Sequence, residues 1–307
     1  MSLLSLGSAG LAAQNNGVAV ASNNAANANT EGYSRQTLVY NSVVYGGVTT
    51  DAPTRYASAL LAGRLRASAG DLAGSTASQA AISDLEDTLT SGTTIDTRLA
   101  SLFSKISQAS ASPTDSALRD SVVQATRDLT DGINTQASQI ADARHTADQR
   151  VGDNTAQASQ LAQQLADANK LVAKTNDPAA QDHRDLIAKQ LSGLVGGAAR
   201  IDPDGNMRFV LDGGAVLVDG PHASQLETTT DPTTGYNTLQ VVDGNNKRDV
   251  TAQVGGSIGA DITFRDTTAK AAADKLDQLA FDTATAFNTQ HGANQALDGT
   301  TGNQMFV

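Results

Sequence analysis

Residues that could carry out chemistry are scarce in this sequence. The 307-residue chain has no cysteine, which excludes disulfides, thiolate metal sites and cysteine nucleophiles. No two of its four histidines have the His-x-x-x-His spacing by which a helix places two ligands on one zinc ion. The four are His145, His183, His222 and His291. We therefore expect no metal site and no other cofactor.

Two acidic clusters are the remaining candidates for chemistry. Asp182-His183-Arg184-Asp185 combines acids and bases, but on a predicted helix it favours an exposed charged patch or an inter-helix salt bridge over acid–base catalysis. The stretch 202–206, Asp-Pro-Asp-Gly-Asn, partly resembles a calcium loop, whose twelfth position is a glutamate. Residue 213 is glycine instead, so we expect a hairpin turn.

The glycine pairs do not indicate a nucleotide site. Neither Gly213-Gly214 nor Gly255-Gly256 is followed by the Lys-Ser/Thr that opens the helix of a phosphate loop. With no candidate catalytic residue, we predict a structural subunit and not an enzyme.

Composition and charge indicate which partners to expect. The net charge is -11 and the pI is about 4.6, which disfavours nucleic acid and anionic membranes and favours protein partners. Aromatic residues are only 4% and tryptophan is absent, which suits long helices packed through small side chains. No apolar stretch reaches the roughly 18 residues of a membrane span, and no basic segment followed by an apolar run marks a cleaved signal. Export would need another route.

The N-terminal segment, residues 1–35, carries an apolar stripe of seven-residue spacing. Its members are Leu4, Leu11, Val18 and Ala25. Three internal glycines weaken a helix here by about 1 kcal/mol each. Two interpretations stay open: a segment disordered in the free monomer that becomes helical against a partner as a coiled coil, or a plain amphipathic surface helix.

The elements that follow predict a mainly α fold with a small β module. Residues 36–54 indicate an extended β arm with a turn at Gly46-Gly47. Residues 55–198 form a long-helix core, with a break near 91–93 and an uninterrupted apolar rhythm over 114–176, about 90 Å of helix. Turn signals divide residues 199–258 into an antiparallel β module, and residues 259–307 form a returning helix and tail. The architecture is an elongated long-helix bundle.

Two motifs go beyond architecture. Residues 22–36, Ser-Asn-Asn-Ala-Ala-Asn-Ala-Asn-Thr-Glu-Gly-Tyr-Ser-Arg-Gln, lead from an Asn-rich helix end into the arm, and residues 259–291 contain Ile-Thr-Phe-Arg-Asp, Leu-Asp-Gln-Leu-Ala and Phe-Asn-Thr-Gln-His. Both stretches resemble the flagellar hook-associated protein 1 family, whose members form the first hook–filament junction. Asp182–Leu186 and Leu217–Gly220 are also similar to segments of that family. Glu31 replaces the family's usual proline.

The resemblance implies a role and a set of partners. The chain would leave the cell through the flagellar type III export apparatus, polymerise with itself at the hook tip, and join the hook protein to the second hook-associated junction protein in the extracellular flagellum. The expected assembly residues are Leu4, Leu11, Val18, Asn24, Asn27, Asn29, Thr30, Gly32, Tyr33 and Arg35. We also expect the chain to be the N-terminal portion of such a subunit, with outer domains and C-terminal helices beyond Val307.

Two alternatives stay open at this point. The first is another axial protein of the flagellum, such as a hook, rod or flagellin-like subunit. The second is a secreted adhesin or coiled-coil interaction module, which would share the long helix without the motifs.

Overall fold

The computed structural model describes residues 3–44, 47–295 and 299–306 and is mainly helical with a small β module, as predicted. The chain divides into two compact units, Met1–Thr76 with Gly152–Ala260 and Ala77–Val151 with Asp261–Val307. Helices α2 (Ala59–Thr90) and α4 (Ser116–Thr175) contribute residues to both. The five-part division of the sequence therefore does not coincide with the units and stays a prediction.

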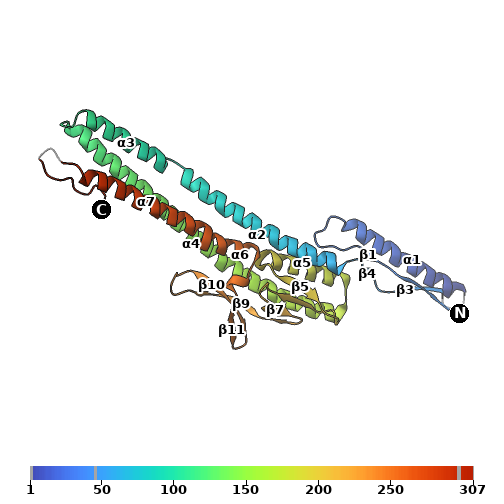
Figure 1. Cartoon of the computed structure of the whole chain (residues 1–307). Coiled ribbons are helices and arrows are strands. Elements are labelled where there is room, and N and C mark those ends of the chain that lie inside the picture. The colour runs from blue at the N-terminus through green and yellow to red at the C-terminus, as the bar shows by residue number, and fades with distance from the viewer. Residues whose placement is uncertain (1–2, 45–46, 296–298, 307) are drawn as a thin grey trace. The chain divides into compact units, whose positions relative to one another are not determined.

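The first unit begins with a helix and an arm. Helix α1 (Leu3–Ala26) packs against a nested pair of hairpins, in which β1 (Gln36–Thr37) pairs with β4 (Thr54–Arg55) and β2 (Tyr40–Val43) pairs with β3 (Gly47–Thr50) (Figure 1). The predicted β arm is therefore present, although Gly46 of its predicted turn lies outside the described residues.

The N-terminal segment differs from the disordered alternative. It is helical in the structure because Ala13 and Val20 lie buried on the side that contacts the arm, and Asn16 donates a 2.9 Å hydrogen bond to Thr50. The sequence predicted this helix only weakly, because it contains glycines and lacks a long buried apolar face.

The β module consists of two antiparallel sheets. One has the order β5 (Ala198–Ile201), β6 (Met207–Val210), β7 (Val216–Asp219), β8 (His222–Ala223), and the other has the order β11 (Asn246–Asp249), β10 (Asn237–Asp243), β9 (Gln225–Thr230). Phe209, Leu217 and Leu239 are fully buried between their neighbours. Asp202 accepts a 2.8 Å hydrogen bond from the backbone N–H of Asn206, which confirms the hairpin turn predicted there.

The predicted strand region extends too far at its C-terminal end. The last strand ends at Asp249, and the 3₁₀ turn η1 (Thr251–Gln253) and helix α6 (Gly256–Thr263) follow. Helix α5 (Pro178–Val195) precedes the module, begins after the N-cap Asp177, and ends just before Gly196.

The second unit is built on packed helices. Helix α3 (Ile95–Ala111) is separated from α2 at the predicted break and runs beside α4 (Figure 1). It packs through Leu102 against Leu129 of α4. The apolar rhythm of α4 predicted its bounds to within two residues, and Ile140, Ala147 and Val151 are buried as expected. No helix of the described residues is apolar over enough of its length to cross a membrane.

The returning helix is the main correction in this unit. In place of the single returning helix predicted within 259–307, the structure has α6 and α7 (Ala269–Gly292), joined by a π-helical turn, η2 (Phe264–Thr268). The turn places Arg265 in the interior, where it pairs with Asp148 of α4. Of the two leucines of α7, Leu276 is buried and Leu279 is 42% exposed.

Candidate functional site

The Asn-rich end of α1 turns the chain into the arm through one side chain. The Asn24 amide oxygen accepts hydrogen bonds from the Gln36 N–H and the Tyr33 hydroxyl, both at 2.8 Å, and its amide nitrogen donates to the Gln36 carbonyl at 2.9 Å. An amide can satisfy both backbone groups of one residue because it carries a donor and an acceptor side by side. Asn24 therefore fixes where the arm begins relative to α1.

The turn between these residues has its own local bonds. Asn27 donates to the Asn23 carbonyl at 3.0 Å and accepts from the Thr30 hydroxyl at 3.2 Å. Gly32 has φ +82°, which other residues adopt only with strain, and a Cβ there would lie 3.4 Å from Leu186 of α5. The motif at residues 22–36 thus places a glycine where the chain must turn next to α5.

Glu31, which replaces the family's usual proline, has a contact of its own. Its carboxylate pairs with Lys189 of α5 at 2.8 Å, and the hydrogen bond and charge of Lys189 lower the pKa of Glu31. The pair lies at the surface and therefore adds little stability. It is a second contact between the turn and α5, beside that of Gly32 with Leu186.

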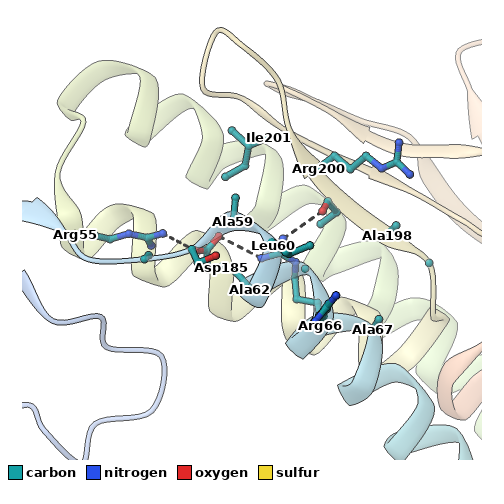
Figure 2. A pocket seen from close by; sticks show the side chains of 16 residues that line it. Arg55, Ala59, Leu60, Ala62, Arg66, Ala67, Asp185, Ala198, Arg200 and Ile201 are labelled. Carbon is teal, nitrogen blue, oxygen red and sulfur yellow. Dashed lines mark hydrogen bonds and ion pairs between the residues drawn. The ribbon is translucent and has the colours of Figure 1, made fainter.

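The arm meets α5 at a charged cluster that we name the arm junction: Ser34, Arg55, Arg66, Asp182 and Asp185. Asp182 accepts from the Ser34 N–H at 3.0 Å and from Arg55 at 2.9 Å, and Arg55 also reaches Asp185 at 2.7 Å. Arg66 of α2 lies 3.6 Å from Asp185 and donates to the Ala199 carbonyl of β5 at 3.2 Å, as the dashed lines of Figure 2 show. Asp182 therefore joins the arm to α5, and Asp185 joins both arginines.

Burial sets the electrostatics of the junction. The side chains of Arg55 and Asp182 are each only 9% exposed. Desolvation lowers the pKa of Arg66, and it likewise lowers that of Arg184, which donates to the Gly205 carbonyl at 2.8 Å. A buried ion pair adds net stability only when its geometry is good, but loss of one partner leaves the other charge unpaired. The expected inter-helix salt bridge is present only between Arg66 of α2 and Asp185 of α5, because the other arginine of the cluster, Arg55, lies on strand β4. The expected exposed charged patch is absent here, because Asp182 and Arg184 are buried.

The structure brings only some of the predicted assembly residues together. Asn24, Asn27, Thr30, Gly32 and Tyr33 gather at the turn. Next to them, the Arg35 guanidinium lies 5.0 Å from the centre of the Tyr56 ring, and the Tyr56 N–H donates to the Arg35 carbonyl at 2.8 Å. Asn29 is exposed.

The predicted apolar stripe is separate from this turn. Its three large members are Leu4, Leu11 and Val18, which are 82%, 64% and 64% exposed. Helix α1 therefore presents to solvent the side chains that the heptad spacing singled out, and buries the opposite side on the arm.

Sequence reasoning missed the arm junction itself. Arg55 and Asp182 are 127 residues apart in sequence, so no local pattern connects them. The available signal was the placement of Arg66 between Leu65 and Ala67, together with the two aspartates on one turn of α5.

Sequence reasoning also missed a serine motif, which the structure shows not to be a catalytic one. Gly255-Gly256-Ser257-Ile258-Gly259 has the spacing of a hydrolase nucleophile elbow. A nucleophile elbow needs a strand before the serine and an exposed hydroxyl. Here the 3₁₀ turn η1 precedes Ser257, and the Ser257 hydroxyl is buried without a hydrogen-bond partner in the described part of the chain. The geometry does not support a nucleophile, and no group of three or more metal-ligating side chains occurs within residues 3–44, 47–295 and 299–306.

Comparison with known proteins decides the family. Residues 82–306, nearly three quarters of the chain, match the model of the "Flagellar hook-associated protein FlgK helical domain". The chain belongs to this family. Flagellar hook-associated protein 1 of Escherichia coli is 27% identical over 329 residues that include 100% of this chain and 60% of the relative, and that of Salmonella typhimurium is 26% identical over 99% and 59%. The chain thus spans about 60% of the length of these FlgK relatives.

A solved structure shows the same fold. The flagellar hook junction protein FlgK from Burkholderia pseudomallei matches with a TM-score of 0.71 and 23% identity, over 78% of this chain and 46% of that one. This likeness shows the fold, and the family match separates the chain from the adhesin and from the other axial proteins considered above.

Proposed function

We propose that this chain is part of a structural subunit that joins the flagellar hook to the filament. The observation that carries the proposal is the construction of its N-terminal end: Asn24 and Asp182 hold the arm in place, while the apolar stripe of α1 stays exposed. An apolar row of this kind lowers its free energy by packing against other helices.

The partners follow from that role. Copies of the subunit polymerise at the hook tip, with the α1 stripes packed into a common core. The hook protein lies on one side and the second hook-associated junction protein on the other, after export through the flagellar type III apparatus to the outside of the cell. The subunit acts mechanically, without catalysis, a cofactor, nucleic acid or a membrane.

Deletion of the gene in the source bacterium tests the role. We expect cells with hooks but no attached filaments, filament protein in the medium, and no swimming; the wild-type gene on a plasmid should restore all three. Normal motility with attached filaments in the deletion strain would rule the role out.

A substitution in the stripe tests the mechanism. A gene carrying Leu11→Asp should fail to restore filaments although the protein is exported, because a carboxylate in a packed apolar seam is strongly unfavourable. The matched control is Ala12→Asp, at the neighbouring exposed position, which lies about a quarter-turn away from the stripe on the same helix. Full restoration by Leu11→Asp would contradict packing through the stripe.

A further inference from the structure

A groove at the N-terminal end of α2 lies next to the arm junction and is not explained by it. Two adjoining hollows of about 650 and 570 Å³ share Ala57, Ser58, Ala62, Arg66 and Asp185 in their walls. The first hollow lies between α2 and strand β5, as Figure 2 shows, and the second between α2, α5 and the Gly32–Arg35 turn. We name the two together the basic groove.

The charge of this groove is opposite to that of the chain. Only one carboxylate, that of Asp185, lies among the lining residues, whereas the chain as a whole has a net charge of -11. The lining cations are Arg35, Arg55, Arg64, Arg66, Lys189 and Arg200. Arg64 and Arg200 are exposed, and neither forms an ion pair with another described residue. The groove therefore attracts negatively charged groups.

Apolar side chains accompany these charges. Leu60, Leu61 and Leu65 line the groove and are 65%, 63% and 59% exposed, although a leucine side chain gains about 2 kcal/mol when it is fully buried. A surface that combines exposed leucines with unpaired arginines matches an acidic helix that carries an apolar side chain.

The second unit of the same chain carries such a surface on the outer face of α7. Phe281 is 67% exposed, and Asp277, one helical turn before it, lies on the same face. Asp282 is adjacent, and neither aspartate forms an ion pair within the part of the chain that the structure describes. The stripe of α1 does not match the groove in this way, because α1 contains no charged residue.

We propose that the basic groove binds the acidic outer face of α7 from a second copy of the chain. Phe281 would pack among the groove leucines, and Asp277 and Asp282 would pair with Arg64 and Arg200. The two surfaces differ, so the contact runs head to tail and leaves a free groove at one end of a row of subunits and a free α7 face at the other. The proposal rests on the self-assembly proposed above and adds a contact independent of α1.

Cross-linking between two single-cysteine variants tests the contact, and the absence of native cysteine makes it specific. Leu61→Cys mixed with Phe281→Cys and a short bismaleimide should give a dimer in at least tenfold higher yield than Leu72→Cys mixed with Phe281→Cys. Leu72 is the matched control because it is 68% exposed on the same helix but does not line the groove. Equal yields from the two mixtures would overturn the proposal, as would preferential capture of Ile82→Cys, an exposed position among the acids of α2.

Charge reversal provides the second arm of the test. Arg64→Glu in the Leu61→Cys copy should lower the yield about tenfold, and Asp277→Arg in the Phe281→Cys copy should restore it. Circular dichroism and urea unfolding of each variant check that it folds. Loss without restoration, in folded variants, would contradict the pairing.

The two proposals can fail separately. Cross-links between Leu11→Cys copies, without any between the groove and α7, would leave assembly through α1 in place and remove only the groove contact. The deletion phenotype tests the junction role without reference to either surface.

Discussion

At the residue scale, one asparagine side chain joins α1 to the start of the arm. Asn24 binds the N–H and the C=O of Gln36 together, which fixes two backbone dihedrals of the arm from a single position on α1. Such a bond pair needs an amide, because a carboxylate cannot donate and a hydroxyl cannot reach both groups. The motif at residues 22–36 therefore has a structural explanation: Asn24 and Tyr33 hold the start of the arm, Asn27 and Thr30 bond to each other within the turn, and Gly32 makes the turn possible.

Asn24→Asp tests the role of Asn24 with almost no change in shape. A negative oxygen would face the Gln36 carbonyl, so we expect a loss of about 1–2 kcal/mol locally. Hydrogen exchange should become faster at residues 33–37, while residues of α4 keep their protection. Asn29→Asp, at an exposed position of the same segment, is the control. Unchanged exchange at residues 33–37 in Asn24→Asp would show that Asn24 does not hold the arm.

Asp182→Ala tests the arm junction. It removes the acceptor of the Ser34 N–H and one of the two carboxylates bound to Arg55, in a site where both charged side chains are 9% exposed. We expect the free energy of unfolding to fall by about 3 kcal/mol, because a buried guanidinium loses part of its pairing. Urea unfolding measures the change, with Asp204→Ala in the exposed β5–β6 turn as the control. Equal effects of the two substitutions would contradict the role of Asp182.

The carboxylate of Asp261 makes the free energy of unfolding depend on pH, and the direction of its pKa shift sets the sign. Burial raises the pKa of Asp261 above its ordinary value of 3.8, and the hydrogen bond and charge of Arg150 oppose the rise. Because the folded chain binds this proton more tightly than the unfolded chain does, the stabilisation is complete below the unfolded pKa and is lost as pH rises through the folded pKa.

Asp261→Asn removes that titration. We therefore expect the stability of Asp261→Asn, relative to the wild type, to increase from about pH 3 to about pH 7. Urea unfolding at a series of pH values measures the difference. A difference that is constant or decreases with pH would show that burial does not dominate at Asp261.

At the element scale, the sequence predicts those helices and strands whose bounds follow from the residues within them. The apolar rhythm of α4 and the turn residues of the β module determine their elements within a few residues, so the sequence predicts them. The π turn η2 was not predictable, because it depends on the pairing of Arg265 with Asp148, 117 residues earlier in the chain. The arm junction was unpredictable for the same reason: Arg55 and Asp182 meet only after α5 packs against the arm.

The packing of α2 predicts opposite effects on stability for alanine substitutions at two of its glycines. A Cβ on Gly70 would lie 2.9 Å from the Ser192 carbonyl oxygen of α5, whereas a Cβ on Gly63 of the same helix would meet nothing within 4 Å. Gly63→Ala should therefore stabilise the chain by up to about 1 kcal/mol through helix propensity. Gly70→Ala should destabilise it by about 1–3 kcal/mol, because backbone atoms must move apart. Urea midpoints measure both, and a stabilising Gly70→Ala would show that α2 and α5 are not in close contact.

At the scale of the whole molecule, the chain combines well-packed units with an N-terminal helix that few contacts hold. Residues such as Leu129, Val151 and Leu165 in α4 are at most 1% exposed, whereas in α1 only Ala13 and Val20 are buried. The stability of α1 in the free chain is therefore low, and the exposed stripe of Leu4, Leu11 and Val18 is the apolar surface that assembly would bury. We therefore predict that α1, although helical in the structure, becomes more stable on assembly.

Hydrogen exchange on the free chain and on subunits attached to isolated hooks tests this prediction. Amides of residues 3–26 should exchange much faster than those of α4 in the free chain, because Gly7, Gly10 and Gly17 each weaken the helix by about 1 kcal/mol. They should slow at least tenfold on the hook, where the stripe would be covered. Gly10→Ala, whose Cβ would meet nothing within 4 Å, should slow exchange of the free chain without any partner. Free-chain protection of α1 equal to that of α4 would mean that the helix is stable alone, so that the exposed stripe would be a preformed docking surface and assembly would not order it.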